Sequence, residues 1–353
     1  MTPAEQTEHS VLCGDQRIFY LEAGPRDGPL LIFIHGWPEL AVSWRHVLPH
    51  FAALGFRVVA PDMRGYGRSG VPSAPDAYRQ SLLVADMLAL LDILGAEKAV
   101  WIGHDWGTAT VWGMASHHPE RCHGVANLCV PYRTIERGVD ALVPLVDRSV
   151  YPAEHHPWGQ WAYMRFCQQH FARVTAVFES DQDASIRAIF RRGDPARLGL
   201  PSGHVDVFRN HGWFGGADAA PDVPRDEAVL SAGELSCYVE ALSRNGFAGP
   251  NSYYLNDAAN LVYSDSAIDG GRLKMPVLFV AARYDITCEA VASSLAEPMK
   301  AHCSRLTTAV IDAGHWVAQE KPAELIEILR RWLGNELPTL SPGGWTDSEA
   351  GSR

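Results

Sequence analysis

The segment Gly103-His104-Asp105-Trp106-Gly107 decides the fold class of this chain. The run Ala99–Ile102 before it is apolar, and Thr108–Ala115 after it is typical of a helix. Two glycines around a central residue favour a tight turn from a strand into a helix, because glycine tolerates strained and crowded backbone. The pattern therefore predicts a strand, a sharp turn with Asp105 at its apex, and a helix.

An aspartate at this apex determines which chemistry is expected. A carboxylate can attack an alkyl carbon directly, without a base to deprotonate it first, and the product is an ester that water must then cleave. Epoxides and haloalkanes suit such a step, whereas peptides do not. An aspartate between two glycines can also be a turn residue that caps a helix, so the rest of the chain has to decide between the two interpretations.

Strand and helix patterns alternate on both sides of this segment. A hairpin is expected over residues 11–21, and continuous apolar runs predict buried strands at 30–34, 57–60, 99–102, 124–130, 276–280 and 307–311. Helices are predicted at 43–54, 78–94, 289–300 and 323–333. Such alternation predicts an α/β fold with a doubly wound, mostly parallel sheet whose strands are covered by helices on both faces.

The alternation stops between about residue 133 and residue 247, where the chain is helical or irregular and rich in aromatic residues and proline. Because open α/β sheets bind ligands at the carboxyl ends of their strands, we expect this stretch to lie there as a mainly helical cap. The predicted organisation is a first core part (1–132), the cap (133–247), a second core part (248–337) and a loose C-terminal tail (338–353).

Composition narrows the classes of partner. The 353 residues carry a formal net charge of −11 without a dense run of Lys or Arg, which argues against nucleic acid or an anionic membrane as a partner. Residues 1–10 lack the basic and apolar regions of a leader, and no apolar run approaches the roughly 18 residues that span a bilayer. Seven cysteines without C-x-x-C spacing predict reduced thiols, and therefore a cytoplasmic protein.

Two later loops complete a candidate triad in the chain order nucleophile, acid, histidine. Asp285 follows the strand predicted at 276–280, and His315 follows the strand at 307–311. His315 would be the general base for water, oriented by Asp285. Either residue alone is weak support, because aspartates after strands often cap helices and loop histidines usually face solvent. Their occurrence together with Asp105 at corresponding strand ends favours catalysis.

An oxyanion formed when water attacks the ester needs hydrogen-bond donors. The turn supplies the backbone N–H of Trp106, and the loop His35-Gly36-Trp37-Pro38 supplies that of Trp37.

These motifs resemble those of epoxide hydrolases of the α/β-hydrolase superfamily over nearly the whole chain. The loop 35–38 is similar to the family's H-G-x-P, 64–69 to its R-G-Y-G-x-S, and 103–107 to its nucleophile motif, all shared with dehalogenases. The resemblance implies that a small apolar epoxide and water give a vicinal diol through an ester on Asp105, without a metal or an organic cofactor.

The resemblance also implies two cap tyrosines that hydrogen-bond the epoxide oxygen and protonate the leaving alkoxide. Gly249–Asn256 fits the family pattern G-P-x-x-x-Y-x-N, which places one of them at Tyr254. The pattern Y-x-x-(aromatic)-x-Q places the other at Tyr163, although Tyr151 or Trp161 would take that position under another alignment.

Two other functions stay open at this stage. A haloalkane or haloacid dehalogenase would use the same nucleophile and base, with the indoles of Trp37 and Trp106 as halide donors. Fluoroacetate dehalogenases resemble the core but have a His-Trp pair where this chain has Tyr163-Met164, so epoxides are favoured. A non-catalytic ligand-binding protein on the same fold is the third possibility. The particular epoxide, the selectivity and the oligomeric state are not predicted.

Overall fold

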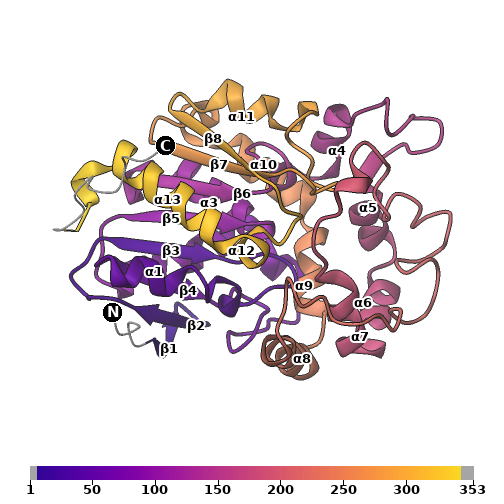
Figure 1. Cartoon of the computed structure of the whole chain (residues 1–353), viewed down its shortest axis with the longest axis horizontal. Coiled ribbons are helices and arrows are strands. Elements are labelled where there is room, and N and C mark those ends of the chain that lie inside the picture. The colour runs from indigo at the N-terminus through magenta and orange to yellow at the C-terminus, as the bar shows by residue number, and fades with distance from the viewer. Residues whose placement is uncertain (1–5, 343–353) are drawn as a thin grey trace.

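The computed structural model describes residues 6–342, and its core is an eight-stranded sheet (Figure 1). In sheet order the strands are β1 (Thr7–Cys13), β2 (Gln16–Ala23), β4 (Arg57–Pro61), β3 (Leu30–Ile34), β5 (Ala99–His104), β6 (Cys122–Leu128), β7 (Val277–Ala282) and β8 (Leu306–Ile311). The strands from β4 to β8 pair in parallel, whereas β1 and β2 are antiparallel. The predicted α/β fold with a mostly parallel sheet is confirmed.

The N-terminal hairpin turns at Gly14-Asp15, as predicted, with Cys13 opposite Gln16. Its first strand begins at Thr7, four residues before the expected start. The added residues Thr7–Ser10 are polar and largely exposed, so their strand conformation depends on pairing with β2 and leaves no apolar pattern.

Helices cover both faces of the sheet. The core helices are α1 (Leu48–Ala53), α2 (Gln80–Ile93), α3 (Trp106–His117), α11 (Glu297–His302), α12 (Val317–Glu320) and α13 (Pro322–Glu336). In Figure 1, α1 and α13 lie in front of the strands. Phe51 of α1 packs on Phe33 of β3, with ring centroids 6.3 Å apart, and Trp332 of α13 is buried. Helix α3 packs on β5 and β6 and against α2. The continuous apolar pattern of β3, β5 and β7 therefore reflects burial from both sides.

Two predicted helices differ from the structure. The helix expected at 43–54 is divided into a 3-10 turn, η1 (Ala41–Trp44), and α1, whose start has a proline at its second position. The helix expected at 289–300 is wrong in its first half. There the carboxylate of Glu289 accepts the amides of Val291, Ala292 and Ser293 and holds a turn, so the helix α11 begins only at Glu297.

The chain between β6 and β7 forms helices without adding a strand to the sheet. These helices are α4 (Val139–Leu142), α5 (Ala162–Gln169), α6 (Phe171–Ser180), α7 (Gln182–Ile189), α8 (Ala232–Asn245), α9 (Ala248–Ser252) and α10 (Asp257–Asp265). Figure 1 shows α5 to α8 grouped at one end of the sheet, on the right of the view. Helix α8 begins with a capping box between Ser231 and Glu234, whereas residues 198–231 contain no helix or strand.

Short 3-10 turns join these elements. Beyond η1 they are η2 (Pro75–Tyr78), η3 (Pro119–Arg121), η4 (Ile135–Arg137), η5 (Val143–Leu145), η6 (Gly159–Trp161), η7 (Pro195–Arg197), η8 (Tyr253–Leu255), η9 (Ile268–Gly271), η10 (Ser294–Ala296) and η11 (Pro338–Leu340). The last of these opens the stretch predicted to be a loose tail, and residues 343–353 of that stretch lie outside the described residues.

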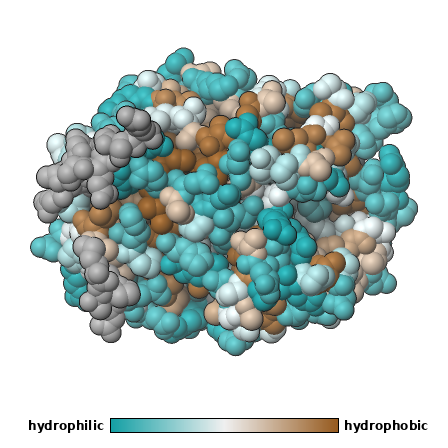
Figure 2. Space-filling view, viewed as in Figure 1, coloured by the Kyte–Doolittle hydropathy of each residue, from teal (hydrophilic) through white to brown (hydrophobic). Residues whose placement is uncertain are grey.

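The surface is mostly hydrophilic on the face shown in Figure 2, with hydrophobic residues interspersed among polar ones. Within residues 6–342, none of the helices has the length and apolar character needed to cross a membrane.

Candidate active site

Asp105 lies at the turn between β5 and α3, and its backbone is strained. Its φ of +49° and ψ of −125° belong to a region that residues with a side chain rarely adopt. The turn also presses against the neighbouring strand, since a β-carbon on Gly107 would lie 2.4 Å from the carbonyl oxygen of Ile34. This packing holds Asp105 at the carboxyl end of β5 and at the start of α3, where the helix dipole favours a negative charge.

The two carboxylate oxygens of Asp105 have different neighbours. The backbone N–H of Trp37 donates to Oδ1 at 2.7 Å. The imidazole Nε2 of His315 lies 3.5 Å from Oδ2. Trp106, whose amide is the other predicted donor, is the first residue of α3. One oxygen is therefore held by a backbone amide, while the other faces the imidazole.

His315 is held on its other side by Asp285. Its Nδ1 lies 2.6 Å from Oδ2 of Asp285, and the amides of Thr287 and Cys288 donate to Oδ1 of the same carboxylate at 3.2 and 3.0 Å. Burial disfavours a charged His315, but the attraction of Asp285 and the hydrogen bond with Asp105 outweigh it, so the pKa of His315 is well above its ordinary value. Burial would raise the pKa of Asp285, but His315 holds it below its usual range.

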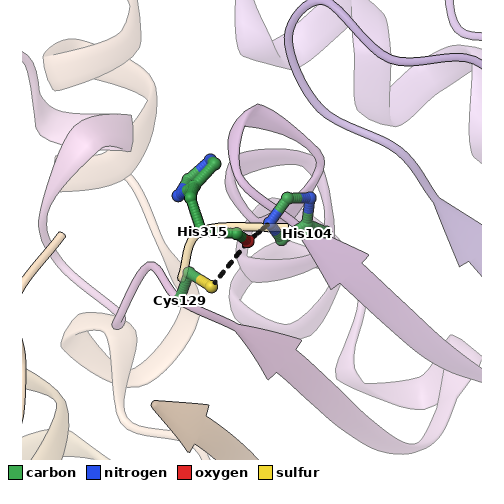
Figure 3. A group of neighbouring side chains, drawn as sticks. All are labelled: His104, Cys129 and His315. Carbon is green, nitrogen blue, oxygen red and sulfur yellow. Dashed lines mark hydrogen bonds between the residues drawn. The ribbon is translucent and has the colours of Figure 1, made fainter. Parts of the chain in front are cut away.

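A second histidine supports the loop that contains His315. His104 is buried, and its Nδ1 lies 2.6 Å from Oε2 of Glu39. Its Nε2 donates to the carbonyl oxygen of His315 at 2.8 Å, and Sγ of Cys129 approaches the same oxygen at 3.4 Å, as Figure 3 shows. Because a carboxylate and a carbonyl oxygen both accept, both ring nitrogens of His104 are donors and the ring is an imidazolium.

The pKa values agree with this charge assignment. Burial would lower the pKa of His104, but the carboxylate of Glu39 raises it to about 10. Burial would raise the pKa of Glu39, but the charge of His104 lowers it to about 2. A buried ion pair thus lies directly behind the catalytic candidates.

Tyr163 and Tyr254 line the same cavity as Asp105 and His315. Tyr163 comes from α5 and Tyr254 from η8, and their rings pack edge to face with centroids 5.9 Å apart. Tyr254 also packs against the ring of Trp106 at 5.2 Å. Burial raises the pKa of both phenols well above the usual value, so both hydroxyls keep their protons and can donate.

The alternatives to Tyr163 lie elsewhere. The hydroxyl of Tyr151 accepts the amide of Ser202 at 3.1 Å and lies 3.5 Å from the carbonyl oxygen of Ile286, and Tyr151 is not part of the cavity wall. Trp161 is fully buried and is likewise not part of that wall. The geometry therefore favours Tyr163 over either of them.

The cavity has a volume of about 600 Å³. Among the aromatic residues of the inserted helical region, Trp213 and Phe214 line it, whereas Trp158 and Phe166 pack on Phe208. The remaining wall includes several polar side chains from one stretch: Arg191, Arg192, Asp194, Arg197, Ser202 and His204.

Two groups of side chains place potential metal ligands close together. They are His104 with Cys129 and His315, and Asp285 with Cys288 and His315. In the first group both nitrogens of His104 already form hydrogen bonds, and in the second Asp285 and His315 bond to each other. The ligand atoms are thus those of the candidate triad and of its support.

Several site residues had no role in the sequence prediction. His104 belongs to the nucleophile motif and Glu39 directly follows the loop at 35–38, but their contact joins positions 65 residues apart. Glu320 accepts the amides of Gly314 and Gly193, each at 3.0 Å, and so ties the loop of His315 to the inserted helical region. No local pattern marks such contacts.

Comparison with known proteins gives a consistent result. A family model for the alpha/beta hydrolase fold matches residues 29–175. Epoxide hydrolase A of Mycobacterium tuberculosis is 34% identical, over 93% of this chain and 97% of that protein. Bifunctional epoxide hydrolase 2 of Rattus norvegicus is 32% identical over 92% of this chain, which spans only 55% of that relative's length.

A solved structure supports the same relationship. The crystal structure of epoxide hydrolase A from Mycobacterium thermoresistibile superposes with a TM-score of 0.76 at 32% identity, covering 94% of this chain and 99% of that one.

Proposed function

The chain belongs to the epoxide hydrolases of the α/β-hydrolase fold, and from this premise we propose that it adds water to an epoxide to give a vicinal diol. The observation that carries the proposal is the arrangement around Asp105. One of its oxygens is held by the amide of Trp37, the other faces His315, and two protonated tyrosines share the cavity with them.

In the first step Oδ2 of Asp105 attacks an epoxide carbon and the ring C–O bond breaks. The new C–O bond makes an ester, and the ring oxygen leaves as an alkoxide that stays attached to the substrate. An alkoxide is a poor leaving group, so donors must act on it as the bond breaks. Tyr163 and Tyr254 supply these donors, and one of them transfers its proton to the oxygen.

In the second step His315 takes a proton from water, and the hydroxide attacks the ester carbonyl carbon. The carbonyl oxygen is Oδ1 of Asp105, which already accepts the amide of Trp37 at 2.7 Å. The amides of Trp37 and Trp106 stabilise the oxyanion that forms there, and Asp285 stabilises the imidazolium. When the intermediate collapses, the bond between the acyl carbon and the diol oxygen breaks, that oxygen takes the proton of the added hydroxyl, and the diol leaves as the carboxylate is restored. His315 keeps the proton from water and is again an imidazolium.

Forming the ester also prepares His315 for its task. The imidazole of the resting enzyme has a raised pKa partly because of its hydrogen bond with Asp105. Esterification removes the negative charge of Asp105, so the pKa of His315 falls. Its proton goes to the tyrosinate left by the first step, and the neutral base is then available when water has to be activated.

The helices between β6 and β7 serve in this proposal as a cap over the carboxyl ends of the strands. Support comes from Tyr163 on α5, which lines the cavity together with Asp105. We also propose a cytoplasmic location, since the seven cysteines are all free thiols, which persist in a reducing compartment.

A dehalogenase with the same nucleophile is disfavoured by one contact. The indole N–H of Trp37 donates to Oδ1 of Asn251 at 3.0 Å, so it is already used and does not await a halide.

Turnover of paired substrates tests the proposed function. Purified protein is incubated with terminal alkyl and aryl epoxides and, separately, with haloalkanes and haloacids of matched chain length. Diol is measured on a chiral column and halide by ion chromatography. We expect diol and no halide release. Halide release without diol would establish the dehalogenase instead, and no product from either set would contradict both.

A further inference from the structure

One side of the active-site cavity is basic. Apart from the candidate triad, the charged side chains that line the cavity are those of Arg191, Arg192, Asp194 and Arg197. They bring three positive charges and one negative charge to this wall, although the acidic residues of the chain, 41 in number, exceed its 30 lysines and arginines. This part of the wall therefore has the opposite charge to the molecule as a whole.

The protein itself neutralises these arginines only in part. The guanidinium groups of Arg191 and Arg197 donate to backbone carbonyl oxygens, at 2.6 and 2.8 Å respectively, and within residues 6–342 neither group forms an ion pair. Nε of Arg192 lies 3.7 Å from Oδ2 of Asp226, and 67% of the arginine side chain is exposed. A guanidinium has five N–H donors, so each of these groups can still bind an anion.

The same stretch of chain lies beside the reacting groups. A β-carbon on Gly193 would lie 2.4 Å from the backbone nitrogen of Gly314, the residue before His315. Arg192 directly precedes Gly193, so the basic wall begins next to the loop of the proposed general base. A substrate whose epoxide reaches Asp105 can therefore extend its substituent to the arginines within one cavity.

A carboxylate is the kind of group that these donors fit. Guanidinium groups bind carboxylates through charge-assisted hydrogen bonds, which are stronger than those between neutral groups. A cationic substituent would be repelled by the three arginines. Because Asp105 repels an anion close to the epoxide ring, the carboxylate has to lie at the other end of the substituent.

We propose that Arg191, Arg192 and Arg197 bind an anionic group on the substituent of the substrate, and that this enzyme therefore prefers epoxides with a carboxylate at the end remote from the ring. This inference rests on the proposed function and gives it a substrate class. It also replaces the small apolar epoxide that the sequence motifs imply with a charged substrate.

Pairs of an acid and its primary amide test the inference. The terminal epoxide of an eight-carbon acid and that of its amide have nearly the same shape, but only the acid is charged at neutral pH. An eleven-carbon pair places the charged end farther from the ring. For each pair the ratio of kcat/KM values, acid over amide, is measured in the wild type and in variants. The wild-type ratio should exceed one for at least one of the two pairs.

Arg191→Gln, Arg192→Gln and Arg197→Gln should each lower this ratio by about 1.5- to fivefold, the effect of one partly exposed ion pair. The triple variant should lower it further. Asp194→Asn should raise the ratio, because it removes the negative charge of this wall and keeps an acceptor for the amide of Ala196.

Arg209→Gln is the matched control, because Arg209 is an exposed arginine of the same inserted region and lies outside the cavity wall. It removes one positive charge from the molecule, as each single variant does, and should leave the ratio unchanged. An equal fall in Arg209→Gln would overturn the inference, since the effect would then come from the net charge alone. A wild-type ratio at or below one for both pairs would overturn it, as would an unchanged ratio in the triple variant.

If the triple variant does not fold, the wild-type protein decides through its dependence on salt. Added sodium chloride screens attraction between charges, so kcat/KM should fall for the acid and stay constant for the amide. Parallel salt dependence for acid and amide would overturn the inference. Failure of the proposed function is distinct, since the wild type would then convert neither member of either pair.

Discussion

Gly193 and Gly314 approach so closely that a β-carbon on either would lie 2.4 Å from the backbone nitrogen of the other. Glu320 accepts an amide hydrogen from both residues and holds the two segments together. Gly314 precedes His315, and Gly193 belongs to the inserted region that lines the cavity. The position of His315, the proposed general base, is thus coupled to the packing of that region.

Gly193→Ala should therefore impair catalysis more than stability. The added methyl group has to push the two backbones apart, which costs about 1 to 3 kcal/mol in overpacking. It also moves the loop of His315, and misplacement of a catalytic group by about 1 Å can cost roughly a hundredfold in rate. Stopped-flow measurement of ester hydrolysis and urea denaturation separate the two effects.

Gly233→Ala is the control for this change, because a β-carbon at Gly233 on α8 meets no atom within 4 Å. Its rate and stability should stay at or above the wild-type values. Wild-type hydrolysis rates in Gly193→Ala would show that the contact does not position His315.

His315→Gln should trap the covalent ester. The variant keeps Asp105 and both tyrosines, so alkylation proceeds, but no base remains to activate water. Intact-protein mass after mixing with epoxide should rise by the mass of one substrate molecule, and peptide mapping should place the addition on Asp105. An unchanged mass in a folded variant that binds substrate would contradict the covalent mechanism.

Asp105→Asn should lower the pKa of His315. The substitution removes a negative charge 3.5 Å from Nε2 that favours the imidazolium, so the proton is lost at a lower pH than in the wild type. Titration of histidine resonances by NMR measures the shift. Asp265→Asn, at an exposed ion pair with Arg137, should leave it unchanged. If His315 has the same pKa in the wild type and in Asp105→Asn, the charge of Asp105 does not control the protonation of His315, and the proposed link between the two steps is wrong.

The parts of this site that could be predicted are those marked by local patterns. Apolar runs end a few residues before Asp105, Asp285 and His315, and parallel strands bring their carboxyl ends to one edge of the sheet. The nucleophile turn itself needs glycines at fixed positions, which the sequence displays. Because of these features, the fold and the three candidate residues could be predicted from the sequence.

The remainder depends on contacts between distant positions. The bond from Glu39 to His104 spans 65 residues, and the approach of Gly193 to Gly314 spans a larger separation still. His204 lies in a stretch without regular structure, where no periodicity indicates which side chains face the cavity. The expected helix at 289–300 fails for a related reason, because the side chain of Glu289 competes with helical hydrogen bonds.

Glu39→Gln should destabilise the protein and change how its stability depends on pH. Removing one member of a buried ion pair costs roughly 3 to 5 kcal/mol. In the folded protein His104 has a pKa of about 10, above its ordinary 6.5. Its contribution to the free energy of unfolding is therefore complete below pH 6.5 and is lost as pH rises through 10. Glu39 has a pKa of about 2 in the folded protein, below its ordinary 4.5. Its contribution to the free energy of unfolding is therefore complete above pH 4.5 and is lost as pH falls through 2.

Urea denaturation at a series of pH values checks this prediction. Wild-type stability should decline between pH 6.5 and 10, and the decline should be smaller in Glu39→Gln. Glu297→Gln, at an exposed pair with Lys300, should reproduce the wild-type profile. Parallel profiles for the wild type and Glu39→Gln would mean that the pair is not charged in the folded protein.

Tyr163→Phe and Tyr254→Phe should each slow formation of the ester. A phenyl ring keeps the packing of both positions, including their edge-to-face contact at 5.9 Å, and removes only the hydroxyl. Loss of one well-placed transition-state donor costs about 3 to 4 kcal/mol, or roughly a hundred- to a thousandfold in rate. The double variant should be far slower than either single one, because no phenol then remains to stabilise the alkoxide. Quenched-flow detection of the ester measures this step even where its hydrolysis limits kcat.

Tyr151→Phe is the control, since its hydroxyl bonds to the amide of Ser202 outside the cavity wall and its loss should leave alkylation near the wild-type rate. If Tyr151→Phe is slow and Tyr163→Phe is not, the first donor has been assigned to the wrong residue. If all the variants, including the double, alkylate at the wild-type rate while folded, neither tyrosine stabilises the opening epoxide. A substrate whose leaving group needs no strong donor, such as a haloalkane, would then explain the same nucleophile and base.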